Sequence, residues 1–386
     1  MNTSFETLDY AVFGIYAIVI LGVGLWVSRD KKGETKSAED YFLASKSLPW
    51  WAIGASLIAA NISAEQFIGM SGSGFAVGLA IATYEWMAAL TLIIVGKFFL
   101  PIFIKKGLYT IPEFVEKRFS SQLKTILAVF WIGLYVFVNL ASVMYLGGLA
   151  LQTILGIDML TGVIGLAAFA AAYSLYGGLS AVAWTDIIQV VVLILGGLVT
   201  TYLALDTVSG GQGFMEGLTT IYHAVPEKFD MILDRSNPEF MNLPGIGVLI
   251  GGMWVANLYY WGFNQYIIQR TLAAKSLEES QKGILFAAGL KMIIPIIVVI
   301  PGIAAYVIVN DPTLLASLGE AGVNNIPSSG SADKAYPWLM QFLPTGLKGI
   351  AIAALAAAIV SSLASMLNST ATIFTMDIYK QLINKN

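Results

Sequence analysis

Residues 52–74 read AIGASLIAANISAEQFIGMSGSG, an apolar stretch that is long enough to cross a bilayer but is interrupted by polar groups. Between Asn61 and Gly74 the interruptions are amides, hydroxyls, one carboxylate and a run of Gly and Ser. The hydrocarbon core of a membrane offers no hydrogen-bond partners, so such groups persist at this depth only where they face protein or a water-filled cavity. The stretch therefore predicts a broken transmembrane helix that lines a binding site.

The composition of the whole chain is typical of a polytopic membrane protein. Hydrophobic residues make up 57% of the 386 residues and charged residues only 12%, about half the share that is usual in soluble domains. The net charge of −3 gives no indication of a nucleic-acid partner. The lack of cysteine excludes disulfides and thiolate metal sites, and a single histidine, His223, leaves little histidine-based chemistry. The start, MNTSFETLDY, lacks the basic region of a cleaved signal peptide, so we expect the first apolar stretch to be retained.

Nine apolar stretches of spanning length follow one another along the chain. They lie at 10–27, 50–74, 77–103, 123–153, 159–177, 181–206, 244–268, 283–309 and 346–376. Because a helix of about 20 residues crosses a hydrocarbon core of roughly 30 Å, the sequence predicts an all-α protein with a single transmembrane domain over residues 1–386. The two long links, 207–243 and 310–345, are rich in Gly, Pro and Asn and are expected to form outer loops with short helices.

Basic residues concentrate in alternate links. Most of the 21 Lys and Arg residues lie in the first, third and seventh links and in the tail. The first link holds Arg29, Lys31, Lys32, Lys36 and Lys46, and the third holds Lys105, Lys106, Lys117, Arg118 and Lys124. The seventh holds Arg270, Lys275 and Lys282, and the tail holds Lys380 and Lys385. The second and fourth links contain none. Since Lys and Arg gather in short cytoplasmic loops, the odd-numbered links are predicted to face the cytoplasm and the N-terminus to lie outside.

A few polar side chains within the spanning stretches carry the candidate chemistry, because a charge at the bilayer centre costs about 2.5–3.5 kcal/mol. They are Gln66, Glu85, Asp186, Asn257 and Lys291. A carboxylate, an amine and two amides can replace water around a polyhydroxylated solute, and Tyr259, Tyr260 and Trp261 offer an apolar face for a sugar ring. The alternative interpretation is that Glu85 and Lys291 form an internal ion pair, that Gln66 and Asn257 bridge helices and that the aromatic rings only pack.

A second cluster, Ser361 and Ser362, lies in the small-residue stretch AIAALAAAIVSSLASMLNST. Adjacent hydroxyls offer two oxygens to a hard cation, which also requires carbonyl oxygens from an unwound backbone. The alternative is that the small residues serve close helix packing. No histidine, metal ligand or nucleophile lies near Glu65, Glu85 or Asp186 in the sequence, so we do not expect an enzyme.

Four long motifs resemble the sodium:solute symporter family, in its bacterial sodium/galactose (sodium/glucose) cotransporter branch. They are NISAEQFIGMSGSG, YSLYGGLSAVAWTD, WVANLYYWGFNQYIIQRTLAAK and AAAIVSSLASMLNSTATIFTMDIYK, and the resemblance runs from about residue 9 to the end. It implies a preliminary helix and link at 9–48, followed by two five-helix repeats of inverted topology, 49–206 and an incomplete repeat of three helices at 244–386. The first helix of each repeat is broken in the family, and AANISAEQ and ANLYYWGFN are the matching polar interruptions.

The resemblance also implies the residues of two sites. For the sugar, the ligands are Gln66, Glu85, Asn257 and Lys291, with Tyr260 stacked on the ring as an inner gate, Trp261 beside it, Met70 on the outer side and Asn61 holding Tyr260. For sodium, the ligands are the carbonyls of Ala59, Ile62 and Ala358 and the hydroxyls of Ser361 and Ser362, with Asp186 on the exit path. Ala88 stands where galactose transporters have a serine, which removes a hydrogen bond of about 0.5–1.5 kcal/mol.

The implied function is sodium-coupled symport of a hexose across the bacterial inner membrane, with sodium as the coupling ion and no other cofactor. The set of Gln66, Glu85, Asn257 and Lys291 favours a sugar over proline, pantothenate or sialic acid. Two alternatives stay open. The chain stops after the ninth stretch while the family continues, so it is either transport-competent or a non-transporting fragment of such a symporter, and the solute is either a hexose or another small solute of the family.

Overall fold

The second apolar stretch is broken at its polar interruption. The computed structural model describes residues 6–29, 36–243, 245–319, 322 and 325–384. Helix α3 (Trp50–Asn61) ends at Ile62, where the backbone becomes extended with φ −78° and ψ 104°. After Ser63 the chain resumes as η2 (Glu65–Met70), a π-helical turn, and continues as α4 (Ser71–Ala76). The predicted broken helix is confirmed.

A second break lies in the seventh stretch, between α13 (Met253–Phe263) and α14 (Gln265–Leu272). Asn264 has an extended backbone there, with φ −86° and ψ 118°. The hydroxyl of Tyr135 is the hydrogen-bond partner of the polar groups at this break. It donates to Asn264 Oδ1 at 2.5 Å and accepts from the backbone N–H of Gln265 at 2.9 Å. Both stretches with polar interruptions are therefore discontinuous helices.

Seven helical segments among the described residues are long and apolar enough to cross a bilayer. They are Thr7–Val27, Leu79–Lys105, Ser121–Gln152, Met159–Val208, Gly245–Phe263, Leu277–Asn310 and Leu347–Ile383. The nine predicted stretches correspond to seven such segments for two reasons. The broken second stretch contains no uninterrupted helix of this length, and the fifth and sixth stretches both lie in α10 (Met159–Val208).

Helix α10 contains 50 residues and would be about 75 Å long if straight, more than twice the thickness of the hydrocarbon core. Gly178 breaks it, with φ +56° and ψ −148°. A Cβ at this position would lie 2.3 Å from the carbonyl oxygen of Tyr41, so both the backbone conformation and the close approach require glycine. The break divides α10 into two segments, each of spanning length, as the two stretches predict.

The other helices complete these spans or lie in the links. The composite spans contain η3 (Leu79–Ala82), α5 (Thr83–Ile94), η4 (Val95–Phe99) and α6 (Leu100–Lys105), then α8 (Ser121–Leu134), η5 (Tyr135–Leu140) and α9 (Ala141–Leu155), then α12 (Gly245–Gly247) and η7 (Val248–Gly252), and finally α18 (Leu347–Ile373) and η10 (Phe374–Ile383). The single-helix spans are α1 (Thr7–Val27) and α15 (Leu277–Asn310). The links carry α2 (Ala38–Leu43), η1 (Ala44–Lys46), α7 (Ile111–Arg118), α11 (Phe214–Ala224), η6 (Pro226–Phe229), α16 (Pro312–Ser317), η9 (Ala332–Lys334) and α17 (Ala335–Met340).

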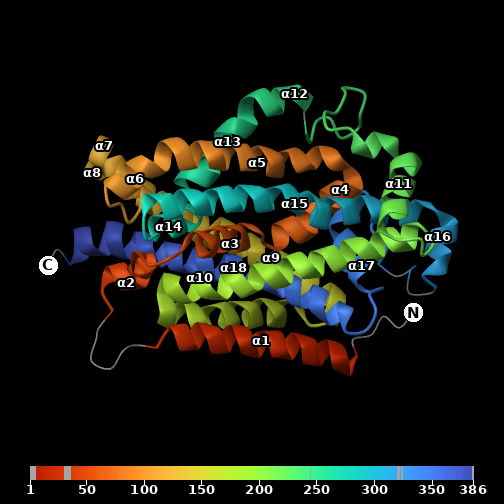
Figure 1. The fold of residues 1–386 in the computed structure, drawn as a ribbon, viewed down its shortest axis with the longest axis horizontal. Helices are drawn as coiled ribbons and strands as arrows, with labels where there is room; N and C mark the ends of the chain where they lie inside the picture. The colour runs from red at the N-terminus through yellow and green to blue at the C-terminus, as the bar shows by residue number, and fades with distance from the viewer. Residues whose placement is uncertain (1–5, 30–35, 244, 320–321, 323–324, 385–386) are drawn as a thin grey trace.

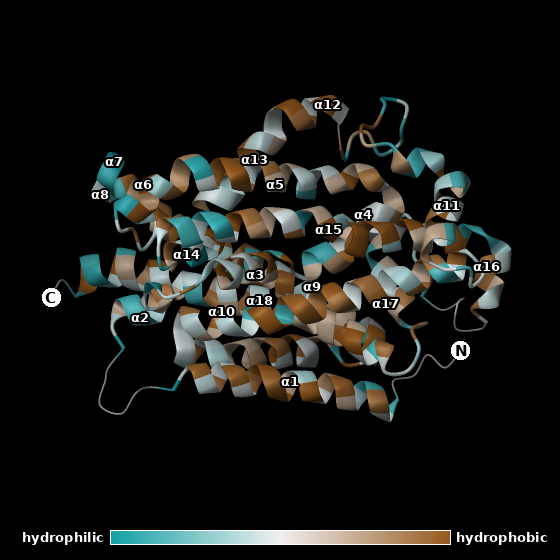
Figure 2. Cartoon of the chain, viewed as in Figure 1, coloured by the Kyte–Doolittle hydropathy of each residue, from teal (hydrophilic) through white to brown (hydrophobic). Residues whose placement is uncertain are grey.

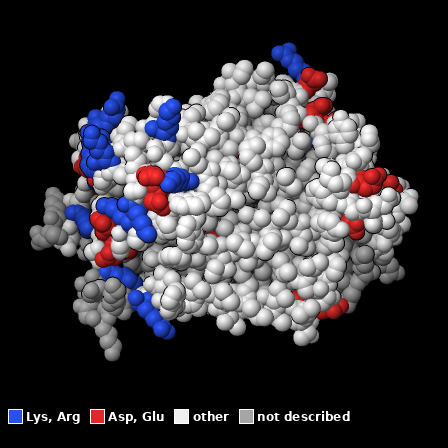
Figure 3. All heavy atoms as spheres, viewed as in Figure 1, with Lys and Arg blue, Asp and Glu red and all other residues white. Residues whose placement is uncertain are grey.

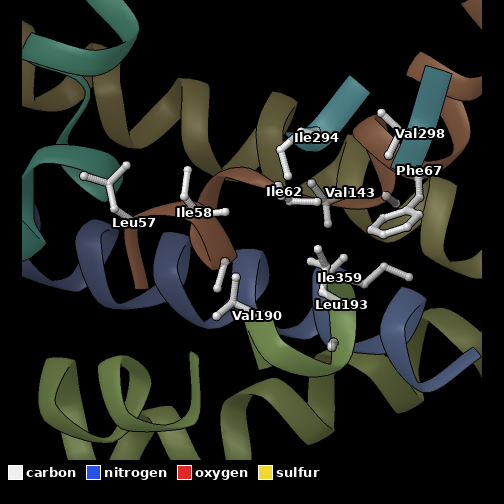
Figure 4. Packing of buried hydrophobic residues seen from close by; sticks show 14 of the residues in the cluster. Leu57, Ile58, Ile62, Phe67, Val143, Val190, Leu193, Ile294, Val298 and Ile359 are labelled. Carbon is white, nitrogen blue, oxygen red and sulfur yellow. The ribbon is translucent and has the colours of Figure 1, made fainter. Parts of the chain in front are cut away.

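The broken helix lies in the core of the bundle, between α15 and α18 (Figure 1). In an apolar 18-residue window of each span, 89% of the residues in the α18 span and 72% of those in α15 are buried, against 17% in α1 at the edge of the bundle. Figure 4 shows Ile62 at the break together with Val143 of α9, Val298 of α15 and Ile359 of α18, all in one apolar cluster. The unwound backbone is thus enclosed by side chains from three other helices.

The edge helix α1 is tied to the start of α18. Asp9 is fully buried, and its Oδ1 accepts from the backbone N–H groups of Gly346 and Gly349 at 2.7 and 2.9 Å. The N-terminal N–H groups of a helix have no intrahelical partner, and an acidic group also interacts favourably with this end of the helix dipole. A carboxylate on α1 therefore caps α18, although more than 300 residues separate the two in the chain.

Charged side chains gather at the two ends of the bundle. Most of the visible Lys and Arg residues lie at the end that carries α2, α7 and α8, where acidic residues lie among them (Figure 3). The charged residues at the opposite end are mostly acidic, and the surface between the two ends is nearly free of charge. The helices between the two ends are predominantly apolar (Figure 2). The N-terminal end of α1 lies at the acidic end (Figure 1). Of the basic residues in the predicted links, Lys31, Lys32 and Lys385 lie outside the described residues.

Candidate functional site

A cavity of about 320 Å³ lies beside the break in the second stretch. Its walls come from the broken helix, α5 and α13, and consist of Asn61, Gln66, Met70, Tyr84, Glu85, Ala88, Ala256, Asn257, Tyr259, Tyr260 and Trp261. All of the predicted sugar-site residues except Lys291 are on this wall. The volume lies at the lower end of the range for small-molecule sites, about 300–1,000 Å³.

Lys291 lies behind this wall, fully buried in α15. Its ammonium group donates to the Glu85 carboxylate and to Asn61 Oδ1, and its Nζ lies 5.0 Å from the centroid of the Trp261 ring. The ion pair predicted by the alternative interpretation is therefore present. A buried charge requires such partners because desolvation is costly. Any solute that reaches Glu85 meets a carboxylate whose charge is already balanced.

Asn61 also orients Tyr260. Its Nδ2 donates to Tyr260 Oη at 2.8 Å, and that hydroxyl is 2.6 Å from the hydroxyl of Tyr266. The contact between Asn61 and Tyr260 is the one that the family resemblance implies. Asn61 thus uses its amide nitrogen for Tyr260 and its amide oxygen for Lys291.

The two other amides bond locally. Gln66 Oε1 accepts from the backbone N–H and the hydroxyl of Ser63, at 2.9 and 3.2 Å. Asn257 Nδ2 donates to the carbonyl of Met253 at 3.1 Å, and its Oδ1 accepts from Trp261 Nε1 at 3.2 Å. Gln66 thus bonds back to the unwound segment and Asn257 bonds within α13, so these bonds are local and do not bridge separate helices.

The predicted sodium residues lie on the far side of the same break. Ser362 Oγ donates to the carbonyl of Ala60 at 3.0 Å and lies 3.5 Å from that of Ile62, so α18 touches the unwound end of α3. The predicted ligands Ala59, Ile62, Ala358, Ser361 and Ser362 are all fully buried. Helix breaks release carbonyl oxygens, and carbonyl and hydroxyl oxygens are hard donors that suit a hard cation.

Asp186 directly adjoins this region. Ser361 Oγ donates to its Oδ1 at 2.5 Å, Ser56 Oγ donates to its Oδ2 at 2.6 Å, and an Arg270 guanidinium nitrogen lies 3.5 Å from the same Oδ2. Arg270 also donates to Ser56 Oγ at 2.8 Å and to Ser365 Oγ. One buried network therefore joins α3, α10, α14 and α18 beside Ser361.

Two basic residues that are predicted to lie in links are buried in helices. Arg270 is fully buried, because α14 continues as a helix beyond the break and carries it to Asp186. Lys124 is buried at the start of α8, where its Nζ lies 2.8 Å from Glu116 and 3.3 Å from Asp377. Both charges serve as internal ion-pair partners, so the prediction that they are loop charges is wrong.

Several residues of the cavity and of its support were not predicted from the sequence. Tyr84 and Ala256 line the cavity, while Tyr135, Tyr266 and Arg270 hold the broken segments. The sequence could have indicated Tyr84, because it precedes Glu85 and lies one helical turn before Ala88. No such indication exists for Tyr135, because a tyrosine in an apolar stretch is equally typical of a membrane interface.

Known proteins resemble this chain over nearly its whole length. A model of the sodium:solute symporter family matches residues 41–386. A sodium/glucose cotransporter of Vibrio parahaemolyticus is 72% identical over 377 residues, which cover 98% of this chain and 69% of that relative. The human sodium/myo-inositol cotransporter 2 is 37% identical over 391 residues, which cover 98% of this chain and 57% of that relative. The chain thus spans between about half and about two thirds of the length of these relatives.

The fold has a solved counterpart. The structure of a Na⁺-coupled sialic acid symporter, in a substrate-bound outward-open state, superposes with a TM-score of 0.82 at 28% identity, and the match covers 98% of this chain and 76% of that chain. The match supports the predicted all-helical, multi-pass symporter fold, with a broken helix at its centre. By sequence and by structure, this chain belongs to the sodium:solute symporter family.

Proposed function

We propose that the chain binds sodium and a hexose and carries out their coupled symport into the cell by alternating access. The observation that carries this proposal is the position of the break at residues 61–66. On one side the break contributes Asn61 and Gln66 to the cavity wall, and on the other it contacts Ser362 of α18. One short unwound segment is thus shared by the cavity and the cluster of hard oxygen donors.

A sugar is the solute that the cavity wall supports best. Glu85, Gln66 and Asn257 supply acceptors and donors for hydroxyl groups, and the rings of Tyr260 and Trp261 supply an apolar face. The relative at 72% identity is named a sodium/glucose cotransporter, and the relatives at about 37% identity are named sodium/myo-inositol cotransporters. A cyclic polyol such as inositol is therefore the second candidate, and Ala88 is the wall residue that distinguishes this cavity from one with a serine hydroxyl.

Coupling follows from the shared segment. Sodium bound by the carbonyl of Ile62 and the hydroxyls of Ser361 and Ser362 would fix the break in the shape that presents Gln66 to the sugar, so each ligand raises the affinity of the other. Asp186, bonded to Ser361, lies where sodium would leave. One inward charge contributes about 2.3 kcal/mol per 100 mV, and a tenfold sodium gradient adds about 1.4 kcal/mol. Together these sustain sugar accumulation on the order of several hundred-fold.

We further propose the placement and repeat boundaries of the chain. The charge distribution supports a bacterial inner-membrane protein with its basic end in the cytoplasm and its N-terminus outside. The breaks at Ile62 and Asn264 support two inverted repeats, 49–206 and the three helices of 244–386, after a preliminary helix and link at 9–48. Sodium is the coupling ion, and we propose neither another cofactor nor an enzymatic reaction.

Uptake into proteoliposomes tests the proposal. We expect saturable, sodium-dependent uptake of labelled glucose or galactose that is lost in Lys291→Ala and in Ser362→Ala. Lys282→Ala, an exposed lysine on the same helix as Lys291, is the matched control and should transport normally. Equal sugar binding with and without sodium would reject the coupling.

The same assay separates a symporter from a fragment. If the chain takes up no sugar but transports once it is extended by the remaining part of the Vibrio relative, the residues form a binding site that is insufficient by itself. If neither form transports glucose, galactose or myo-inositol, the proposed function is wrong. Binding of labelled sugar to the unextended chain, with Lys291→Ala as the comparison, shows whether the site forms without transport.

A further inference from the structure

An outer loop holds the outer end of the broken helix. Helix α4 ends at Ala76, and the last carbonyls of a helix have no intrahelical partner. Lys228, in η6 on the link 207–243, donates from Nζ to the carbonyl of Phe75 at 2.9 Å and to that of Ala76. A side chain from more than 150 positions further along the chain thus caps this helix.

The same ammonium group contacts the helix against which α4 packs. Lys228 Nζ lies 4.2 Å from the centroid of the Tyr306 ring on α15, and Phe75 meets that ring edge-on with centroids 5.3 Å apart. Lys228 is partly buried, and burial lowers its pKa, while the nearby Glu239 and Glu227 raise it. The cation therefore contacts the end of the broken helix and its supporting helix at once.

The backbones around this contact also approach closely. A Cβ at Gly78, which follows α4 with φ +99°, would lie 2.3 Å from the carbonyl oxygen of Lys228. Along its side, α4 has no room against α15, because a Cβ at Gly74 would lie 2.5 Å from the carbonyl oxygen of Val299. Helix α4 is thus held laterally by α15 and at its end by the loop, so movement away from α15 must break the Lys228 contacts.

We propose that Lys228 is a positioning residue that holds the outer half of the broken helix against α15. This proposal rests on the proposed function, because Gln66 and Met70 on the cavity wall lie in η2, which continues directly into α4. A cation is favoured at the C-terminal end of a helix by the helix dipole and by the free carbonyls. Lys228 thereby resists outward movement of α4 and keeps Gln66 in place for the solute.

Thiol labelling measures this role without any transport. The chain contains no cysteine, so Ser73→Cys places a single thiol at a partly buried position on α4. We expect a membrane-impermeant methanethiosulfonate reagent to modify this thiol about tenfold faster when Lys228→Met is added, which corresponds to about 1.4 kcal/mol. Lys228→Arg keeps a cation within reach of the carbonyls, so its rate should stay within about twofold of the Ser73→Cys parent.

Arg235→Met is the matched control, because it removes a basic side chain from an exposed position on the same link. Equal rates in Lys228→Met and the parent overturn the proposal, and so does an equal acceleration by Arg235→Met. Lys228→Gln, which keeps a neutral donor, should give an intermediate rate and replaces Lys228→Met if that variant does not fold. A Lys228→Gln rate equal to the parent rate also overturns the proposal.

A second readout separates this proposal from the proposed function. Labelling requires neither sodium nor sugar, so a chain that does not transport still tests Lys228. In a form that transports, Lys228→Met should raise the sugar KM several-fold with little change in kcat, and Lys228→Arg should restore it. A fall in kcat with an unchanged KM contradicts a role in positioning Gln66.

Discussion

The family resemblance implies that Ala88 stands where galactose transporters have a serine. It lies on the cavity wall and is almost fully buried. We expect Ala88→Ser to lower the KM for galactose by about 2- to 12-fold, because one added hydrogen bond contributes about 0.5–1.5 kcal/mol. Sodium-dependent uptake measures the change, with Ala89→Ser, a buried neighbour that is not on the wall, as the control. An unchanged KM, or an equal effect at Ala89, contradicts a direct contact with the sugar.

Lys291 and Glu85 depend on each other for stability. Lys291→Met leaves the Glu85 carboxylate buried without its counter-ion, which costs about 3–5 kcal/mol. The double variant Lys291→Met with Glu85→Gln removes both charges, so we expect its melting temperature in detergent to lie well above that of Lys291→Met alone. If the double variant melts no higher than Lys291→Met, the pair does not stabilise the fold through charge balance.

For single residues, the sequence identifies the polar side chains that are costly in the hydrocarbon core of a bilayer. Glu85, Lys291 and Asn257 could be predicted because each is costly in a bilayer unless it has a partner or a cavity. The buried position of Arg270 could not be predicted, because a charge near the end of an apolar stretch is equally typical of a loop. Its partner Asp186 lies about 80 residues away in the sequence, and only the packing of α10 and α14 against α3 and α18 brings them together.

The break between α13 and α14 depends on one tyrosine from another element. Tyr135→Phe removes the group that satisfies the backbone N–H of Gln265 and the side chain of Asn264. A buried polar group without a partner costs about 1–3 kcal/mol, so we expect a lower melting temperature in detergent. Tyr145→Phe, at an exposed position on α9, is the control and should melt like the parent. Equal melting temperatures of the two variants would show that other groups form hydrogen bonds with the polar groups at the break.

Discontinuities differ in how well sequence predicts them. The breaks at Ile62 and Asn264 were predictable, because amides and hydroxyls interrupt apolar runs there. The break at Gly178 was expected only from the total length of the apolar residues, since SLYGGLSA is short and neutral. The cap of α4 by Lys228 was not predictable at all, because the chain between them passes through α10 before it returns to the end of α4.

The charged ends of the molecule predict its orientation in the membrane. We expect an impermeant thiol reagent added to intact cells to label Arg235→Cys but not Arg118→Cys, and to label both once the membrane is opened. Both arginines are exposed, and they occupy an outer link and a basic link respectively. The lack of native cysteine makes each label specific. Labelling of Arg118→Cys alone in intact cells would reverse the proposed orientation.

The contact between Asp9 and the start of α18 forms late in synthesis of the chain. Asp9 leaves the ribosome 337 residues before Gly346, and at about 5–20 residues per second this interval is roughly 20–70 s. Throughout that interval the carboxylate has no N–H groups of α18 to accept from. Helix α1 also packs against α10, which is synthesised before α18, so the arrival of α18 completes a contact surface that α10 has already begun.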